Sequence, residues 1–385
     1  MPLLCSVLIL ATSLYVCVAL LFLIGLFHPR CGKSAAQPFV SVIVAARNEE
    51  AFIGDCLAGL VWQTYPPDRH EILVVDDDSE DRTREIAKAF CERHPHVRLL
   101  TPGPEDEGLR AKKRPMNAGI RASRGDILLT TDADCRVQPT WVASTVACFE
   151  PDVGAVIGFS QIDRSKSITL TQKLQAIDFL ALMSAAAGAA SLGVPLAASG
   201  QNLAYRKSLF EAAGGFREIG HRPSGDDVLL LQLMRRAGKG RIVFNADPGA
   251  FNATNRVESL PGLIRQRRRW ASNAAVQARL NRSFFGYIAA VFLVNLLIPC
   301  ALIDALLRGT SASDCLSVAA VPLVCLGVKT LMDLAVLLRG ATLFRRLDLL
   351  PAFPLWAVLQ PLYILFIGLA GTLGGFVWKG RRHGA

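Results

Sequence analysis

The sequence predicts an α/β domain with a mainly parallel central sheet, joined to one N-terminal and about three C-terminal transmembrane helices. An uncharged apolar run opens the chain, further apolar runs fill its last quarter, and short β-branched runs alternate with amphipathic segments between them. With 51% hydrophobic and 19% charged residues, the chain of 385 residues is too apolar to be disordered. Its ten cysteines occur singly, which excludes the paired spacing of a disulfide framework or a zinc site.

The apolar runs predict the membrane segments. Residues 2–27 carry no charge and are long enough to cross a hydrocarbon core of about 30 Å. A cleaved signal peptide is the alternative, but a basic leader and a small-residue cleavage site are missing. Three further apolar stretches lie at 284–307, 315–338 and 349–378, and prolines at the start of the last one leave open that part of it lies along the interface. We expect an anchor at 1–28, a globular domain at 38–255, a basic interfacial segment at 256–283 and a membrane region at 284–378.

Lysine and arginine next to the spans indicate the orientation. Cations follow the first span and are dense before the second, which places the domain at 38–255 in the cytoplasm and the chain in the cell (inner) membrane. The basic tail Lys379–His383 does not fit this pattern if three spans precede it. The number of C-terminal spans and the side of the C-terminus therefore stay open.

The net charge limits the classes of partner that the chain is expected to bind. The chain has 42 Lys and Arg against 32 Asp and Glu, a balance of +10 that suits nucleic acid, an anionic membrane surface or a phosphate-bearing substrate. The basic stretch adjoins an apolar span and lacks interleaved aromatic residues, so nucleic-acid binding is disfavoured. A membrane and a phosphate-bearing substrate remain.

Alternating patterns between the first two spans predict the elements of the α/β domain. Runs of β-branched residues alternate with apolar residues at helical spacing, which is typical of a helix-covered parallel sheet. Ligands bind such sheets at the carboxyl ends of their strands. The expected strands are 40–45, 71–75, 97–100 and 126–130, and the expected helices are 52–61, 81–93, about 115–123 and about 141–149.

Acidic clusters follow two of these strands. Asp76, Asp77 and Asp78 come after one, and Asp132 and Asp134 after another. Ser79 and Asp81 are ordinary helix-capping residues. Two carboxylates at i and i+2 on irregular backbone can instead hold one hard cation together with substrate phosphates, so Asp132 and Asp134 indicate a Mg²⁺ or Mn²⁺ site.

Two further segments carry candidate site residues. Asp226 and Asp227 precede a leucine-rich helix, either as acids favoured by its dipole or as a general base whose pKa a neighbouring carboxylate raises. Gln266 to Trp270 reads QRRRW. A positive membrane flank explains its arginines and leaves Gln266 and Trp270 unexplained.

Taken together, these motifs resemble the membrane-bound family-2 glycosyltransferases. The resemblance covers about 39–275, and its strength lies in the order of several modest motifs. The matching segments are VIVAARNEE at 42–50, VVDDDSEDRT at 74–83, KKRPMNAG at 112–119, GDIL at 125–128 with Asp132 and Asp134, SGQNLAYR at 199–206, GGF at 214–216, GDD at 225–227 and QRRRW at 266–270.

The resemblance implies a GT-A fold and an inverting transfer from a nucleoside-diphosphate sugar, usually UDP-linked, to an alcohol. It implies a divalent cation at Asp132 and Asp134, and a catalytic base at Asp227 beside Asp226, which replaces the usual glutamate. Asp78 stands where the family often has glycine. The implied donor-binding residues are Arg47, Glu49, Asp76, Asp77, Lys112, Asp132, Gln266 and Arg269, and Trp270 is the implied acceptor contact.

The acceptor and the product length are less defined. The apolar segment 170–199 cannot be a span if Asp132 and Asp227 act on one sugar, so we expect a buried or interface-lying helix. The expected acceptor is a lipid or a glycan, and a pocket beside such a helix favours a lipid or lipid-linked acceptor over a soluble one. A processive polysaccharide synthase is the alternative function, and a catalytically inactive nucleotide-sugar-binding subunit is the non-enzyme alternative.

Overall fold

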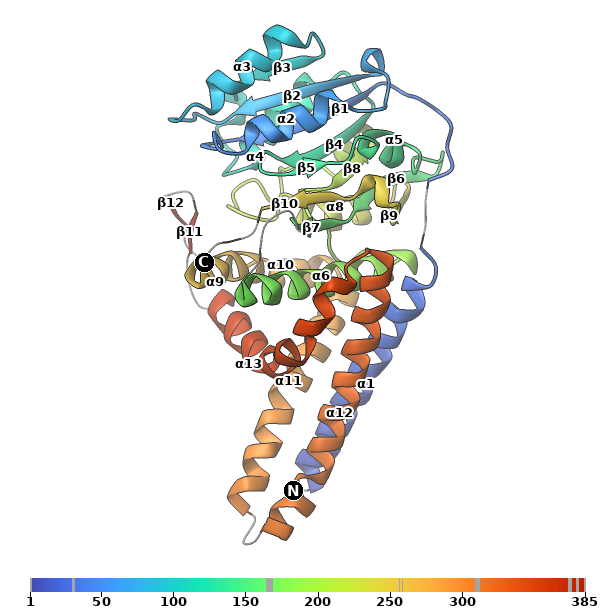
Figure 1. Ribbon diagram of the computed structural model, residues 1–385, viewed down its shortest axis with the longest axis vertical. Helices are drawn as coiled ribbons and strands as arrows, with labels where there is room; N and C mark the ends of the chain where they lie inside the picture. Colours follow the sequence, from blue (N-terminus) through green and yellow to red (C-terminus); the bar gives the residue numbers. More distant parts are fainter. Residues whose placement is uncertain are drawn as a thin grey trace. The chain divides into compact units, whose positions relative to one another are not determined.

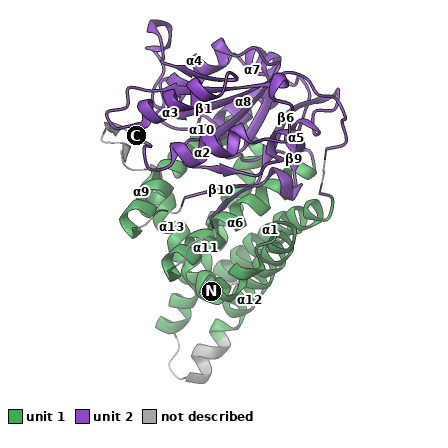
Figure 2. Ribbon diagram, turned by 45° about the horizontal axis from the view of Figure 1, so that its top comes forward, with its two compact units in different colours: residues 1–28, 168–192, 257–385 green, residues 29–167, 193–256 purple. Residues whose placement is uncertain are grey.

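The computed structural model describes residues 2–29, 32–163, 169–255, 257, 259–308, 312–372, 376–378 and 381–383. They fall into two units, which Figure 2 colours separately. The α/β unit comprises residues 29–167 and 193–256, and the helical unit comprises residues 1–28, 168–192 and 257–385. Arg256, Glu258 and Lys379, which belong to the predicted basic segment and tail, lie outside the described residues.

A mostly parallel sheet is the centre of the α/β unit (Figure 1). Among the described residues, seven strands pair in the order β3-β2-β1-β4-β8-β6-β9, with β8 antiparallel to both of its neighbours. A smaller sheet has the order β5-β10-β7. The strands are β1 Val40–Ala46, β2 His70–Asp76, β3 Val97–Leu100, β4 Ile127–Asp132, β5 Arg136–Val137, β6 Val153–Gly158, β7 Ser160–Ile162, β8 Leu203–Arg206, β9 Arg241–Asn245 and β10 Asn252–Thr254.

Helices cover both faces of this sheet. Val42 and Val44 of β1 pack in one core with Leu57 and Leu60 of α2. Ile43 points to the opposite face, where it lies against Gly119 of α4. The helices of this unit are α2 Ile53–Val61, α3 Thr83–Arg93, α4 Lys113–Ala122, α5 Trp141–Val146, α7 Lys207–Ala212 and α8 Val228–Ala237, with 3₁₀ turns η1 Pro67–Arg69, η2 Pro104–Asp106 and η3 Pro248–Ala250.

The pairing of β1 brings the two predicted acidic clusters to one sheet edge. Ala46, its last residue, pairs with Asp76 of β2, and Ala45 pairs with Asp132 of β4. Neighbouring strands lie about 4.8 Å apart, so the backbones of Asp76 and Asp132 are separated by about 10 Å across the end of β1. The predicted order of strands and helices up to α5 is confirmed.

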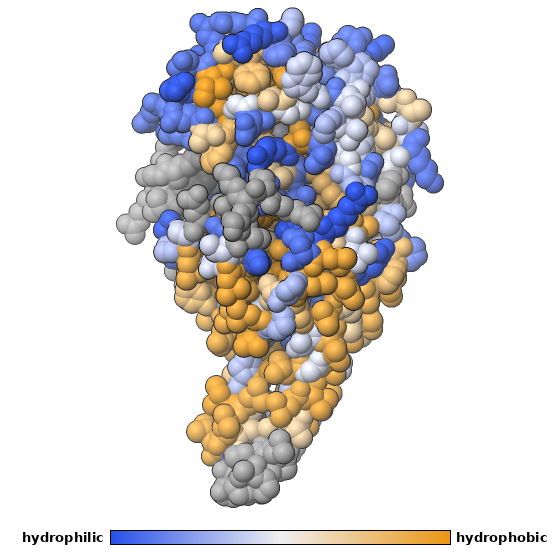
Figure 3. Space-filling view, in the orientation of Figure 1, coloured by the Kyte–Doolittle hydropathy of each residue, from blue (hydrophilic) through white to orange (hydrophobic). Residues whose placement is uncertain are grey.

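The helical unit is assembled from three separate segments of the chain. By length and composition, five of its described helices could cross a membrane, and three of them are C-terminal. Apolar residues dominate the surface of the long helices in Figure 3. The helices are α1 Pro2–Leu26, α6 Leu170–Ser191, α9 Leu260–Ala271, α10 Ala274–Leu280, α11 Arg282–Arg308, α12 Ala312–Leu343 and α13 Phe353–Thr372, with η4 Leu347–Ala352 and the short strands β11 Phe376–Trp378 and β12 Arg381–His383.

The last apolar stretch contains several elements. The structure has a 3₁₀ turn containing Pro351, then α13, and then β11 from Phe376, and by length and composition Leu347–Gly371 could cross a membrane as one segment. Proline lacks a backbone N–H and its ring restricts the preceding residue, which explains why the regular helix begins only after Pro351.

Helix α6 packs tightly within the helical unit. A Cβ atom on Gly25 of α1 would lie 2.0 Å from the carbonyl oxygen of Gly188 of α6, so these two helices touch backbone to backbone. A Cβ atom on Gly340 of α12 would instead meet the side chain of Ser184 of α6, so glycine is needed there to accommodate that side chain. Close contacts between small residues are typical of helix pairs in membranes. By length and composition α6 could itself span a membrane, and 67% of its apolar window is buried, against 33% for α1.

Four buried polar side chains join α1, α12 and α13. Lys329 and Asp333 of α12 form an ion pair of 2.8 Å between Nζ and Oδ2. Tyr15 of α1 donates a hydrogen bond to Asp333, and Lys329 donates one to Gln360 of α13. Each group has a partner of opposite polarity, which a charged pair in an apolar bundle requires.

Candidate active site

A lysine lies among the acids at the end of β4. Asp132 is the last residue of β4, and Lys112, immediately before α4, forms a short ion pair with it. Lys112 Nζ also lies 3.6 Å from Asp226 Oδ2. Burial opposes the charge of Lys112, but the carboxylates of Asp132 and Asp226 outweigh it and raise the lysine pKa. The structure thus joins two motifs that are distant in the sequence.

Asp227 lies beside this cluster as the N-terminal cap of α8. Its Oδ1 accepts a hydrogen bond of 2.6 Å from the Val228 amide, and its Oδ2 accepts one of 3.0 Å from the Gly200 amide. Burial and the Asp226 carboxylate raise the pKa of Asp227. A place at the start of the helix and the role of a base are therefore compatible: the cap hydrogen bond holds the carboxylate in place, and burial makes it a better proton acceptor.

Gly200 brings a loop against the charged cluster. A Cβ atom at this position would lie 3.1 Å from Lys112 Nζ and 3.4 Å from Asp226 Oδ2. The contact with Asp226 is an ordinary one, whereas the contact with Lys112 is tight enough that a Cβ atom would require the lysine to shift by a few tenths of an ångström. Glycine at this position lets the backbone approach and donate to Asp227.

Asp132 and Asp134 fit a divalent cation. Donor atoms of Asp132, Asp134 and Cys135 lie within 4.8 Å of one another. Burial, together with the negative charges of Asp132 and Glu49, raises the pKa of Asp134 to about 7. Such a concentration of carboxylate oxygens is costly without a positive charge, and oxygen ligands are those that Mg²⁺ and Mn²⁺ prefer.

Arginines hold the acids that follow β2. Arg84 lies 3.1 Å from Asp76, and Arg114 lies 2.8 Å from Asp77 and 2.9 Å from Asp78. Asp76 and Asp77 are buried, whereas the Asp78 side chain is 58% exposed. Asp78 has a φ of 58°, a left-handed backbone that glycine adopts most easily, which explains why glycine is expected there.

The loops after β1 and β2 are bonded to each other. The amides of Asn48 and Glu50 donate to Ser79 Oγ and to Asp81 Oδ2, at 3.1 Å in both cases. Ser79 and Asp81 therefore bridge two loops, and the capping role predicted for them is wrong: the cap position of α3 is Arg82, without a side-chain cap hydrogen bond, although Asp81 Oδ1 accepts a hydrogen bond of 3.0 Å from the Thr83 amide. Arg47 lies 3.7 Å from Glu80. Glu49 is close enough to Asp134 to contribute to its pKa.

The two adjacent lysines before α4 point to different partners. Lys112 enters the acidic cluster, whereas the buried Lys113 Nζ donates hydrogen bonds of 2.9 Å to the carbonyls of Arg222 and Ser224. Lys113 thereby ties the start of α4 to the segment that leads into Asp226. Lys112 is the lysine that matches the family motif. The structure shows that its neighbour Lys113 has different partners.

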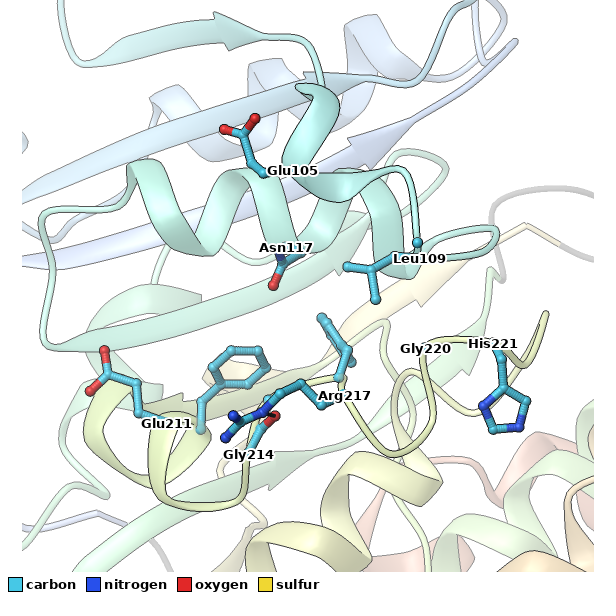
Figure 4. Close-up of a pocket in the computed structure, with 12 residues that line it drawn as sticks. Glu105, Leu109, Asn117, Glu211, Gly214, Arg217, Gly220 and His221 are labelled. Carbon is cyan, nitrogen blue, oxygen red and sulfur yellow. Dashed lines mark hydrogen bonds between the residues drawn. The ribbon is translucent and has the colours of Figure 1, made fainter.

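A cavity of about 610 Å³ lies elsewhere in the α/β unit (Figure 4). The loop at 105–109, Asn117 of α4 and the segment 210–221 line it, and the labelled Glu105, Arg217 and His221 come from the first and last of these. Its lining includes none of the acids described above. The GGF motif at 214–216 thus borders this cavity.

The remaining predicted residues lie on α9 of the helical unit. Gln266 has a buried Oε1 atom without a hydrogen-bond partner among the described residues. Arg269 occupies the last turn of α9 and Trp270 its penultimate position. The ring of Trp270 lies 6.0 Å from the ring of Phe179 of α6, centroid to centroid.

Sequence reasoning missed several residues that the structure ties to the predicted ones. Arg84 and Arg114 hold the acids after β2, Gly200 donates to Asp227, and Arg267 contacts Trp270. Arg114, Gly200 and Arg267 all lie inside quoted motifs, so their position was a signal. The partners of Arg114 and Gly200 are far away in sequence, so those contacts could not be predicted, whereas Arg267 and Trp270 are three positions apart on one helix.

Comparisons with known proteins agree with this geometry. Residues 41–214 match the family model described as Glycosyl transferase family 2. The probable glycosyltransferase YdaM of Bacillus subtilis is 31% identical over 252 residues, which cover 64% of this chain and 58% of that protein. The beta-monoglucosyldiacylglycerol synthase of Synechocystis sp. is 34% identical over 125 residues, which cover 32% of this chain and 26% of that protein. The chain therefore matches less than two thirds of the length of either relative.

A solved structure supports the fold. The mannosyltransferase PcManGT from Pyrobaculum calidifontis, solved in complex with GDP-Man and Mn²⁺, has a TM-score of 0.64 at 20% sequence identity. The match covers 89% of this chain and 99% of that one. At this level of identity the likeness concerns the fold, which is GT-A.

Proposed function

We propose that the chain, whose residues 41–214 match the family model described as Glycosyl transferase family 2, is an inverting glycosyltransferase. It transfers a sugar from a nucleoside-diphosphate sugar, UDP-linked, to a hydroxyl of a lipid or lipid-linked acceptor. The reaction takes place at the cytoplasmic face of the cell inner membrane. The observation that carries the proposal is Lys112 between Asp132 and Asp226, with Asp227 held beside them by the Gly200 amide.

Asp227 is the catalytic base of the proposed reaction. Its raised pKa suits a carboxylate that takes the proton of the acceptor hydroxyl. The acceptor oxygen then forms a bond to the anomeric carbon while the bond to the diphosphate oxygen breaks, and the electron pair leaves with the nucleoside diphosphate. One displacement inverts the anomeric centre, so no covalent enzyme intermediate is needed. Asp226 supports the base by its charge and by its contact with Lys112.

Cationic groups balance the negative charge of the departing diphosphate. Lys112 is the protein cation at this position, and Gln266 and Arg269 are assigned to the diphosphate as well. Asp132 and Asp134 would hold Mg²⁺ or Mn²⁺, which supplies Lewis-acid stabilisation of the leaving group when bound. PcManGT, which shares the fold, was solved with Mn²⁺.

The remaining site residues are assigned to the nucleoside of the donor and to the acceptor. Asp76 and Asp77, with Arg47 and Glu49 at the same sheet edge, are assigned to the nucleoside. Trp270 is assigned to the acceptor. A lipid acceptor is supported by the apolar helical unit and by a relative named as a beta-monoglucosyldiacylglycerol synthase.

The test is a turnover assay on membranes that carry the protein. A panel of nucleotide sugars is supplied with Mg²⁺ or Mn²⁺ and endogenous lipids, and the products are identified by mass. Asp227→Asn should lower turnover by about 10²- to 10⁴-fold, the usual loss when a general base is removed. Asp68→Asn removes an exposed carboxylate in η1 and should leave turnover unchanged.

The products decide between the proposal and its alternatives. A lipid that gains one sugar supports it and identifies both substrates. A ladder of chain lengths would replace it with a polysaccharide synthase. Donor binding without turnover, across lipid and soluble acceptors, would replace it with a binding subunit.

A further inference from the structure

Asp178 is a single carboxylate in the middle of the apolar helix α6, and it contacts two other helices. Its Oδ2 atom lies 2.8 Å from Arg267 Nη2 of α9. It also accepts a hydrogen bond of 3.4 Å from the hydroxyl of Tyr363 of α13. An ionisable group within such a helix is costly, so its partners point to its role.

Arg267 transmits this contact to Trp270. The guanidinium carbon lies 4.3 Å from the centre of the Trp270 ring, within the range of a cation–π contact. The two residues are three positions apart on α9 and therefore share one face of the helix. Phe179, the neighbour of Asp178, lies 6.0 Å from the same ring. A continuous path of contacts thus runs from Asp178 through Arg267 to the indole.

The burial of Arg267 argues against a simple membrane flank. It is 4% exposed, while Arg265 of the same helix is exposed and better suited to contact lipid headgroups. Its Nε and Nη1 atoms make no hydrogen bond to the described residues. A buried ion pair is rarely the cheapest way to join two helices, because apolar residues of similar size do so without desolvating charges. The planar guanidinium does offer one fixed geometry, with an ion pair at its edge and a ring on its face.

We propose that Asp178 and Arg267 are positioning residues that fix the orientation of the Trp270 indole for the acceptor. The inference rests on the proposed function, because it takes Trp270 to be the acceptor contact. Asp178 sets the direction of the guanidinium, and the guanidinium covers one face of the ring. The opposite face and the edge of the indole are then presented in one orientation.

The test compares Arg267→Lys and Asp178→Asn with the wild type. Lysine keeps the charge but loses the planar stack, and asparagine keeps the size but loses the ion pair. Each variant should raise the KM for the acceptor by about 10- to 100-fold, the scale of a small misplacement, while the KM for the donor stays unchanged. Arg279→Lys and Lys173→Gln, at exposed positions on α10 and α6, are the matched controls.

A double-mutant cycle separates positioning from a general loss of structure. If Arg267 acts through the indole, Arg267→Lys has no further effect on acceptor KM in a Trp270→Phe background. Additive losses, or equal changes in donor and acceptor KM, would overturn the inference. Melting temperatures in detergent check that each variant is folded, and if Asp178→Asn fails to fold, the Arg267→Lys cycle decides alone.

The outcome also distinguishes the inference from the function on which it rests. Wild-type protein without transfer to any acceptor would refute the proposed function. Trp270→Phe with wild-type acceptor KM would refute the assignment of Trp270 to the acceptor, and with it the inference, but not the transfer reaction. A Trp270→Phe defect that neither Arg267→Lys nor Asp178→Asn reproduces would refute only the positioning role.

Discussion

The buried ion pair of Lys329 and Asp333 predicts an unusual pattern of stability. The two side chains are 1% and 5% exposed, and each has one further polar partner. Lys329→Met keeps the length of the side chain but leaves the Asp333 carboxylate with the Tyr15 hydroxyl as its remaining hydrogen-bond partner among the described residues. Removing one partner of a buried ion pair in this way lowers the free energy of unfolding by about 3–5 kcal/mol.

The hydrogen bond from Tyr15 to Asp333 remains in this variant and reduces the loss of unfolding free energy only slightly. Hydrogen bonds between membrane helices contribute about 0.6 kcal/mol on average, so we expect a net loss of about 2–4 kcal/mol. At about 2–4 °C per kcal/mol, the apparent Tm should fall by about 5–15 °C. The double variant Lys329→Met with Asp333→Leu removes both charges and should recover most of this loss, because an apolar pair carries no desolvation cost.

The assay is thermal unfolding of the purified protein in detergent, at one heating rate because unfolding of such proteins is often irreversible. Arg308→Met, which breaks the exposed ion pair with Asp304, is the control and should change Tm little. A single variant as stable as the wild type, or a double variant as unstable as the single one, would show that this pair is not buried as described.

The other predictions concern the site and the helix contacts. Asp226→Asn removes one of the two causes that raise the Asp227 pKa, so the acid limb of the kcat profile should move to lower pH; an unmoved limb would mean that another group controls it. Lys112→Met should raise the donor KM by about 10- to 100-fold, as loss of a charged contact does, and an unchanged donor KM in steady-state kinetics would remove Lys112 from the donor site. Gly188→Ala should lower Tm because its Cβ meets the backbone of Phe22 at 2.3 Å, whereas Gly286→Ala, in open space on α11, should raise it slightly; equal shifts would contradict the close packing of α1 and α6.

Local patterns were sufficient to predict much of the α/β unit. β-branched runs and helical spacing are properties of a few adjacent residues, and the strand ends then bring Asp76 and Asp132 to one edge through parallel pairing. The link of Lys112 to Asp226 depends on a contact across more than a hundred residues, which periodicity does not encode.

The sequence was less informative about α6 and its partners. Its composition is compatible with a span, a buried helix and an interfacial helix, because all three are apolar. The contacts of Gly188 with Gly25 and of Asp178 with Arg267 show which helices α6 packs against, and both contacts are properties of residue pairs that are distant in sequence. The roles of Asp178 and Arg267 therefore emerge only from the folded chain.

The segments of the helical unit lie before, within and after the α/β unit in the sequence, and this order matters for biosynthesis. Helix α6 emerges from the ribosome in the middle of the α/β unit, long before Gly340, against which its Ser184 packs, has been translated. Until α12 has been translated, the face of the 22-residue apolar helix α6 that packs against α12 has no partner. The α/β unit therefore cannot be exchanged between related proteins as one continuous stretch. Any such exchange would also move α6, which would lose the helices of this protein that it packs against.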